Sequence, residues 1–289
     1  MVSSEFSRSI CDRAVRVSAY GTSRNWSFAG EDAHEIESKN PGITEDLRRV
    51  LESHNVVRAL SPKPVFSASV AVPDQLTSER LPNVFRGADA DGVVLEKPGD
   101  AYLLTSADCL CTILRDPQRG TTIATHCGRD ALIDRGFLEG KPPRERHSII
   151  DAAMDVIVAR GWEQGDRLDA FLTVGIGPVQ FTHFTTPTVW NAQGKEEMNP
   201  HVKVNRSLIT FLMATYNRIG HGVVMNVDSG AINLVRLVKA QLARWGVPTE
   251  TIRWDGIDTA MDTRDDGTYK FHSNRRGDTS RNLVLVQRL

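Results

Sequence analysis

Three short apolar runs between residues 87 and 130 limit most strongly what this chain can fold into. An Asp-Pro pair and an Arg-Gly pair, both between residues 116 and 120, are turn signals that separate the second run from the third. The pattern predicts three strands, of which the last two run antiparallel because a short loop joins them. Cys109 stands where the second strand begins and His126 where the third ends, so their side chains should meet at one edge of a sheet. The runs are Ala101–Leu104, Leu110–Leu114 and Thr121–Thr125.

A thiol beside an imidazole suits two kinds of chemistry. A histidine stabilises the thiolate form of a nearby cysteine, which makes the cysteine a nucleophile. The same pair can supply one sulfur and one nitrogen ligand to a soft metal such as zinc. The spacing of Cys109 and His126 leaves both interpretations open, together with a purely structural one in which the cysteine packs in the core.

Several short motifs resemble those of the laccase-domain family, whose members were first labelled polyphenol oxidases. The central stretch carries Ala-Asp-Gly at 90–92 and Thr-Ser-Ala-Asp-Cys at 105–109, then a histidine 17 residues after the cysteine, followed by Gly128. The motifs stand in the family's order and span nearly the whole chain. The other three are Gly-Thr-Ser-Arg at 21–24, Gly-Ile-Gly-Pro at 175–178 and Phe-His-Ser-Asn-Arg-Arg at 271–276.

The resemblance implies both a fold and an activity. The implied fold is of α+β type, with mixed sheets packed as a β-sandwich and flanked by helices. The implied activity is metal-assisted chemistry on purine nucleosides, either phosphorolysis or adenosine deamination, with Cys109 and His126 as metal ligands. Zinc suits such donors, whereas multicopper sites need several histidine-rich motifs, and the eight histidines here are scattered.

Three departures from the family's pattern fall on this chemistry. The family's first metal ligand is a histidine in a Gln-Val-His-Gly segment, but the corresponding residues 64–71 read PVFSASVA. Where the family has His-Ala-Gly-Trp-Arg-Gly, this chain has HCGRDA at 126–131, so Arg129 is displaced by one position. The family's late Cys-Thr pair is replaced by Asp258 before Thr259. The resemblance therefore leaves the metal site one ligand short.

Two residues near Cys109 are further site candidates. Asp108 is expected to orient His126 or to hold a substrate amine, or else to bond to backbone at a strand end. Cys111 shares a strand face with Cys109, which makes it a candidate third metal ligand. Two residues along a strand are about 6.6 Å apart, however, which is long for two ligands of one ion. Core packing is the alternative for Cys111.

Three arginines are candidates for binding substrate or phosphate: Arg24, Arg129 and Arg275. A guanidinium group matches the oxygens of a phosphate, which is the reason to single them out. The resemblance favours Arg24 and one residue of the Arg275-Arg276 pair near the pocket. Each alone could equally be a solvated surface charge.

Composition indicates an ordinary globular protein. Hydrophobic residues make up 40% of the 289 and charged residues 25%, and the net charge of −1 gives no reason to expect a nucleic-acid partner. No apolar run approaches the roughly 18 residues of a membrane helix, and no secretory signal is apparent, so we expect a cytoplasmic location without membrane association. Four clustered cysteines agree with a reducing compartment. The expected partner is a small molecule, a purine nucleoside with phosphate.

The remaining pattern predicts one mixed α and β domain over residues 15–289, after a polar leader at 1–14 that we expect to be poorly ordered. Residues 27–43 read as a loop. Helices are predicted from Thr44 to His54, from Ser148 to Gly161, over Leu208–Ile219 and over Ile232–Trp245. Further strands are predicted at Val65–Val72, Leu168–Val174, Thr251–Trp254 and Asn282–Leu289.

Three functional hypotheses follow. The first is a metal-assisted enzyme acting on purine nucleosides, with zinc as the cofactor. The second has no cofactor: Cys109 and His126 are similar to the Cys–His pair of bacterial glutamine deamidases, and thiolate attack would give an amidase or deamidase. The third is a non-catalytic relative that keeps the fold and binds a ligand.

Overall fold

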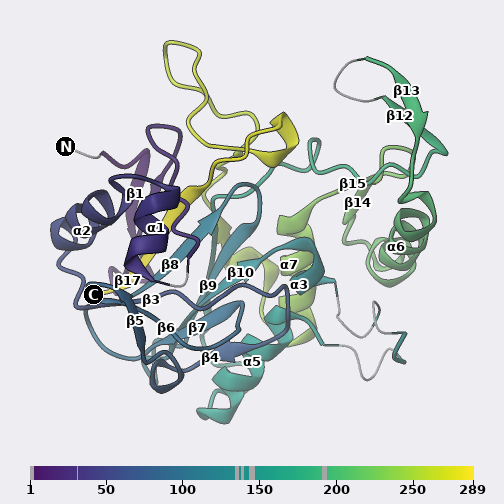
Figure 1. Cartoon of the computed structure of the whole chain (residues 1–289). Coiled ribbons are helices and arrows are strands. Elements are labelled where there is room, and N and C mark those ends of the chain that lie inside the picture. Colours follow the sequence, from purple (N-terminus) through teal and green to yellow (C-terminus); the bar gives the residue numbers. More distant parts are fainter. Residues whose placement is uncertain (1–2, 31, 134–136, 138–139, 143–146, 191–193) are drawn as a thin grey trace.

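Two mixed β-sheets packed face to face form the centre of the molecule, and helices cover the outer face of each sheet (Figure 1). The structure is a computed structural model that describes residues 3–30, 32–133, 137, 140–142, 147–190 and 194–289. This arrangement confirms the predicted α+β fold with a sandwich of mixed sheets flanked by helices.

The larger sheet has seven strands in the order β1-β2-β17-β8-β3-β6-β5. Most neighbours are antiparallel, but β3 runs parallel to both β6 and β8. The strands are β1 Phe6–Ile10, β2 Val15–Tyr20, β3 Arg58–Leu60, β5 Ser78–Leu81, β6 Val84–Arg86, β8 Asp100–Ser106 and β17 Asn282–Arg288.

The smaller sheet has six strands in the order β16-β11-β9-β10-β7-β4, with two parallel pairs, β11 with β16 and β4 with β7. Its strands are β4 Val70–Ala71, β7 Gly92–Leu95, β9 Leu110–Arg115, β10 Thr122–Cys127, β11 Asp169–Thr173 and β16 Ile252–Trp254.

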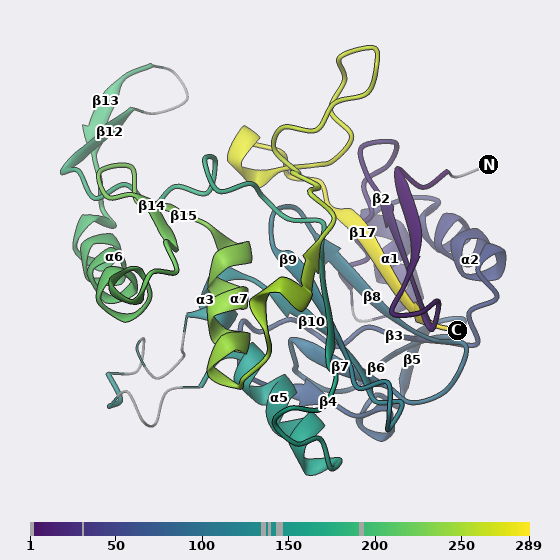
Figure 2. The same ribbon diagram turned by 180° about the vertical axis from the view of Figure 1, so that it is seen from behind.

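Helices α1 and α2 lie on the larger sheet, and α3, α5 and α7 lie on the smaller one (Figure 2). Helix α6 and two small hairpins stand to one side of the sandwich. The helices are α1 Ala33–Lys39, α2 Ile43–Ser53, α3 Arg129–Leu132, α5 Ile149–Ala159, α6 Val202–Thr215 and α7 Leu234–Arg244. The hairpins are β12 Thr188–Trp190 with β13 Glu196–Met198, and β14 Val224–Asn226 with β15 Ala231–Ile232. Short 3-10 helices are η1 Pro73–Gln75, η3 Asn217–Ile219, η4 Thr249–Thr251 and η5 Asn274–Arg276.

Because successive side chains of a strand point to opposite faces of the sheet, the apolar side chains lie in separate layers. Along β9, Cys111 and Ile113 face the interior between the two sheets, while Leu110 and Leu114 face the helices. Both faces of β9 and β10 are therefore buried, which explains why their sequences read as continuous apolar runs rather than alternating ones.

The three central runs form β8, β9 and β10, as predicted. Strands β9 and β10 pair antiparallel, and the register places His126 opposite Cys111. Strand β8 belongs to the other sheet, so residues 107–109 carry the chain across the sandwich. Cys109 lies in this crossing segment, at the end of the sandwich where β10 also ends.

The predicted helices at 44–54 and 148–161 are confirmed. Ser148 caps α5 by accepting a hydrogen bond from the Asp151 N–H, and the Asp151 carboxylate accepts one from the Ser148 N–H. His54 ends α2 and hydrogen-bonds the Tyr20 hydroxyl at 2.7 Å, as a boundary histidine would. Among the described residues, no helix is both long and apolar enough to cross a membrane.

Three segments differ from the prediction. Residues 6–10 of the expected leader form β1, because backbone pairing with β2 needs no apolar side chains; residues 1–2 lie outside the described residues. The expected strand at 65–72 is reduced to β4, since the backbone before it bends toward Asp91. The expected loop at 27–43 contains α1, which Asp32 caps by accepting from the Glu35 N–H.

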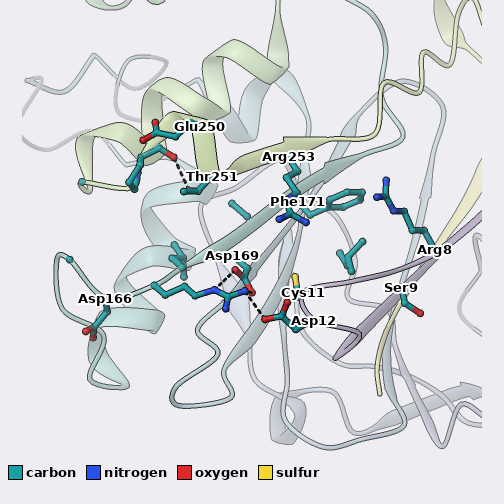
Figure 3. Close-up of a pocket in the computed structure, with 17 residues that line it drawn as sticks. Arg8, Ser9, Cys11, Asp12, Asp166, Asp169, Phe171, Glu250, Thr251 and Arg253 are labelled. Carbon is teal, nitrogen blue, oxygen red and sulfur yellow. Dashed lines mark hydrogen bonds and ion pairs between the residues drawn. The ribbon is translucent and has the colours of Figure 1, made fainter.

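One side of the sandwich is open, because β1 and β16 are edge strands of their sheets and residues from both line the same cavity (Figure 3). The cavity has a volume of about 610 Å³. It lies at the end of β11 that pairs with Arg115, whereas Cys111 pairs with Thr173 at the other end of that strand. The cavity is thus remote from Cys109.

Gly21 is the point where the N-terminal strands meet the C-terminal loop. A Cβ atom there would lie 1.7 Å from the carbonyl oxygen of Lys270, a backbone atom that cannot move aside freely. We expect Gly21→Ala to lower the free energy of unfolding by about 2 kcal/mol or more in urea denaturation. Ser23→Ala, at an exposed position two residues on, is the control and should change it little. Equal stability of the two variants would contradict this packing.

Candidate functional site

Cys109 and His126 come together at the end of the sandwich, as their spacing predicts. Ser106, at the end of β8, shapes the turn that presents the cysteine, because its hydroxyl accepts a hydrogen bond of 2.9 Å from the Cys109 N–H. Cys109 is partly exposed, whereas His126 is only 4% exposed. The Cys109 sulfur is therefore accessible while the imidazole beside it is shielded from solvent.

The His126 ring is held between a carboxylate and the thiol. Its Nδ1 lies 2.8 Å from Asp91 Oδ1, and the ring's other nitrogen is left for the hydrogen bond to Cys109. Asp91 is fully buried, and its Oδ2 accepts hydrogen bonds from the backbone N–H groups of Ser67 and Val65. The three side chains thus form a Cys109–His126–Asp91 triad in which Asp91 orients the His126 ring.

His126 and Asp91 each favour the charged form of the other. Burial alone would lower the pKa of His126, but the negative charge of Cys109 and the hydrogen bonds to Asp91 and Cys109 raise it to about 10. Burial would raise the pKa of Asp91, yet its hydrogen bonds with His126 and Ser67 hold that pKa below the ordinary value.

Phe66 lies where the resemblance would place the missing histidine. Its ring packs against the His126 ring at a centroid distance of 5.4 Å. A Cβ atom on Gly128 would lie 3.1 Å from two carbons of the Phe66 ring and 3.2 Å from the Cys109 sulfur. Phe66 therefore packs on one predicted metal ligand, His126, and borders the same glycine as the sulfur of the other, Cys109. Its ring cannot donate an electron pair to a metal.

The donor set does not fit the metal that the resemblance implies. Cys109 and His126 supply two donors, and both oxygens of Asp91 are already used by His126 and by backbone N–H groups. Cys111 is fully buried in the layer between the sheets. Across the described residues, no group of three His, Cys, Asp or Glu side chains suited to a metal ion is found. Two ligands are fewer than the three or four that zinc takes in proteins.

Asp108 holds segments together instead of orienting His126. Its Oδ1 accepts a hydrogen bond of 2.9 Å from the Thr259 hydroxyl, and its Oδ2 accepts one of 3.2 Å from the Arg275 N–H. Its carbonyl accepts from the Ile176 N–H. Asp108 therefore ties the motif segments near 176 and 275 to the crossing segment that carries Cys109, and the carboxylate that orients His126 is Asp91.

The predicted arginines have different surroundings. Arg24 is bound by Asp46 at 2.9 Å and by the Pro41 carbonyl, away from the triad residues. Arg129, one residue after Gly128, pairs with Asp130 at 2.5 Å. Arg276 is a structural clamp on the Thr259 and Phe271 carbonyls and on Asp278.

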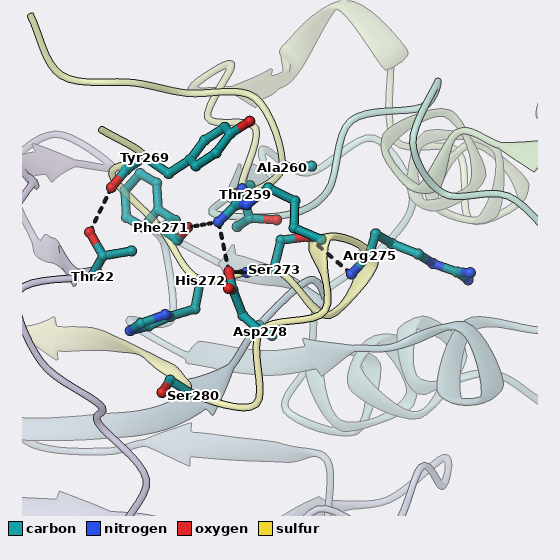
Figure 4. Close-up of polar contacts among 12 residues, drawn as sticks. Thr22, Thr259, Ala260, Tyr269, Phe271, His272, Ser273, Arg275, Asp278 and Ser280 are labelled. Carbon is teal, nitrogen blue, oxygen red and sulfur yellow. Dashed lines mark hydrogen bonds and ion pairs between the residues drawn. The ribbon is translucent and has the colours of Figure 1, made fainter. Parts of the chain in front are cut away.

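Arg275 is the predicted arginine best placed to meet a ligand. Its side chain points away from the Ser273 and Asp278 cluster (Figure 4) and packs over the Phe181 ring, 5.2 Å from the centroid. Within the described parts of the chain, its guanidinium group forms no hydrogen bond or ion pair, and its backbone is anchored on Asp108 beside Cys109.

Asp91 is a site residue that the sequence pattern does not single out, although it belongs to the Ala-Asp-Gly motif. For His183, five residues after Pro178, the sequence favours a loop histidine over a residue that approaches the site. His183 is only 4% exposed, and neither ring nitrogen has a hydrogen-bond partner among the described residues. Burial, with the nearby charges of Arg129 and Arg275, lowers the pKa of His183 to about 3, so this imidazole is neutral.

Residues 10–288 match the family described as multi-copper polyphenol oxidoreductase laccase. The chain therefore belongs to this family, which confirms the resemblance that its motifs indicate. Comparison with curated proteins finds no match.

Three solved structures share the fold. The hypothetical protein YfiH of Bacillus licheniformis is 15% identical, with a TM-score of 0.60 over 94% of this chain and 92% of that one. A DUF152 protein of Neisseria meningitidis is 18% identical, with a TM-score of 0.60 over 95% and 94%. YlmD of Geobacillus stearothermophilus is 16% identical, with a TM-score of 0.57 over 95% and 92%.

The proton on His126 gives a pH-dependent contribution to stability. Its pKa is raised from 6.5 to about 10 in the folded state, so this contribution is complete below about pH 6.5 and is lost as the pH rises toward 10. We expect the free energy of unfolding of His126→Gln to fall less than that of the wild type over this range. The exposed His34→Gln is the control and should follow the wild type. Parallel curves for all three proteins would show that His126 carries no such proton.

His183 should have the opposite pH dependence. Its pKa is lowered from 6.5 to about 3, so the folded state loses stability as the pH falls from 6.5 toward 3. We expect His183→Leu to remove this loss and to add about 1–2 kcal/mol near pH 7, because it removes two buried nitrogens that have no hydrogen-bond partner among the described residues. Denaturant titrations at pH 4.5 and 7 measure both effects. Destabilisation at both pH values would mean that the imidazole is satisfied by a partner.

Proposed function

We propose that this protein is a thiol-dependent hydrolase that cleaves a carbon–nitrogen bond, with Cys109 as nucleophile, His126 as acid and base, and Asp91 as the residue that orients His126. The observation that carries the proposal is the imidazole held between a buried carboxylate and an accessible sulfur. This is the arrangement required for an activated nucleophile, with the base itself oriented by a third group.

The reaction would proceed in two stages. The Cys109 thiolate attacks an amide or amidine carbon, His126 gives its proton to the departing nitrogen, and ammonia leaves as a sulfur–carbon bond remains. Water, deprotonated by the now neutral His126, then attacks the same carbon. The sulfur–carbon bond breaks, and Cys109 returns as thiolate with His126 protonated. The N–H of Cys109 is engaged by Ser106, so it is not free to stabilise the intermediate.

The choice between this chemistry and the metal-assisted one rests on the donor set. The Phe66 ring stands beside Cys109 and His126, where a third ligand would be needed. Phosphorolysis of a nucleoside needs no thiolate nucleophile, whereas deamination can use one. Adenosine carries its amino group on an amidine carbon, so the substrate class implied by the family resemblance remains the first to test, and a primary carboxamide such as that of glutamine is the second.

Among the described residues the Arg275 guanidinium group has no hydrogen-bond or ion-pair partner, which supports a substrate that carries a negative charge or an electron-rich oxygen. Its backbone N–H is fixed by Asp108, the residue before Cys109. A guanidinium that stacks on an aromatic ring and has no acid partner can bind an incoming oxyanion without breaking an existing ion pair.

Ammonia release from adenosine and from glutamine tests the proposal, measured with and without a chelator. We expect activity that survives chelation and falls at least about 1000-fold in Cys109→Ala and His126→Gln. Cys11→Ser is the matched control, because this half-buried thiol lies outside the site and burial raises its pKa to about 12.

Alkylation by iodoacetamide separates this proposal from a non-catalytic role. In the wild type, Cys109 should react fastest of the four cysteines, and His126→Gln should slow that reaction at neutral pH without changing the labelling of Cys11. Activity that disappears on chelation would favour the metal-assisted hypothesis. A Cys109 thiol as unreactive as Cys11, with no ammonia release, would favour a ligand-binding relative.

A further inference from the structure

The cavity at the open side of the sandwich has features of a second ligand site, far from Cys109. Its walls come from β1 and the turn after it, from residues 165–171, and from η4 with β16. Its volume of about 610 Å³ falls in the range of roughly 300–1,000 Å³ that is usual for small-molecule sites. Arg115, at this end of β9, is four residues or roughly 13 Å along the strand from Cys111.

Two arginines face this cavity from opposite sheets. On β1, Arg8 lies opposite Val17, whose side chain is in the layer between the sheets, so Arg8 shares that inward face. On β16, Arg253 lies opposite Phe171, which also belongs to the inner layer. Figure 3 shows the Phe171 ring between the two guanidinium groups. Both arginines are exposed, because β1 and β16 are edge strands of their sheets.

Most acids of the cavity are already paired, but these arginines are not. Arg167 bonds Asp12 at 2.6 Å and Asp169 at 2.9 Å, and Asp166 is bound by Arg119 at 2.8 Å. Among the residues that the structure describes, Arg8 and Arg253 form no hydrogen bond or ion pair. Glu250 is the lining acid for which the described residues offer no partner, and Asp12 and Asp169 share the single guanidinium group of Arg167. Arg8 and Arg253 are thus distinguished by the lack of a described partner and not by an excess of positive charge around the cavity.

The floor of the cavity is apolar. Ile10, Leu168, Ala170 and Phe171 line it and are each at most 8% exposed. Cys11 adds no charge, because burial and the neighbouring Asp169 raise its pKa to about 12. The site therefore combines an apolar floor that includes an aromatic ring with two cationic groups that have no partner in the part of the chain that the structure describes.

We propose that this cavity binds a small anion with a flat apolar body, such as an aromatic carboxylate, sulfonate or phosphate monoester. The planar part packs against the floor around Phe171, and the anionic group is held between the guanidinium groups of Arg8 and Arg253. This site is separate from the triad, and it does not depend on the reaction proposed there.

Isothermal titration calorimetry with naphthalene-2-sulfonate tests the proposal, with uncharged naphthalene-2-sulfonamide as the matched ligand. We expect one sulfonate per chain and binding of the sulfonamide that is weaker by about tenfold or more. Arg8→Gln and Arg253→Gln should each weaken sulfonate binding by a similar factor, and Arg253→Lys by less. Naphthalene-2-carboxylate and 2-naphthyl phosphate, titrated alongside, identify the preferred anion.

Arg218→Gln is the control protein, because this exposed arginine, in η3, lies outside the cavity and should bind the sulfonate like the wild type. Equal binding of the sulfonate and the sulfonamide would overturn the proposal, as would sulfonate binding unchanged in Arg8→Gln and Arg253→Gln. Inward charges on edge strands can also serve to prevent pairing between molecules. If light scattering shows that Arg8→Gln or Arg253→Gln dimerises while its sulfonate binding is unchanged, the arginines serve to prevent pairing between molecules instead.

Discussion

The hydrogen bond between Asp91 and His126 is the interaction on which the rest of the site depends. Asp91 stands just before β7 and His126 near the end of β10, and these neighbouring strands bring the two side chains together in the buried end of the sandwich. The same carboxylate accepts hydrogen bonds from the backbone N–H groups of Val65 and Ser67, so it also fixes the segment that carries Phe66. A buried carboxylate without these partners would be costly, and the local backbone is arranged to satisfy it.

The chain keeps the fold of its family, but at Phe66 it departs from the metal chemistry that the family resemblance implies. The chain keeps the fold of its structural neighbours over more than nine-tenths of its length. Phe66 itself has a φ of +53°, in the left-handed region that a non-glycine residue rarely adopts, and it is 46% exposed. A strained, half-exposed phenylalanine contributes little to the core, which agrees with a role at the site, where it packs on His126.

Residues with a clear local pattern could be predicted from the sequence. Strands β8, β9 and β10 follow from continuous apolar runs, and the meeting of Cys109 with His126 follows from the short turn between β9 and β10. Strand β1 could not be predicted, because its polar residues form a strand only through pairing with β2. The role of Asp91 required knowing that β7 lies next to β10, a contact between segments about 30 residues apart that no local pattern encodes.

The same limit applies to Asp108 and to the second cavity. Asp108 is adjacent to Cys109 in sequence, which favoured it as the partner of His126, but the crossing between the sheets directs its carboxylate to Thr259 and Arg275. Arg8 and Arg253 are 245 positions apart, and they line one cavity only because their strands are edges on the same side of the sandwich. Composition and spacing describe elements, whereas these sites arise from the order of strands within the sheets.

Elemental analysis of the purified protein and of Phe66→His decides between a thiol nucleophile and a metal centre at Cys109. We expect the wild type to hold zinc and copper at well below one ion per chain after dialysis, because the described residues give Cys109 and His126 no third donor. Phe66→His supplies that donor beside both residues, and its zinc content should approach one ion per chain. One zinc ion per wild-type chain that disappears in Cys109→Ala would contradict a thiol nucleophile, because it would establish a metal centre at the same residues.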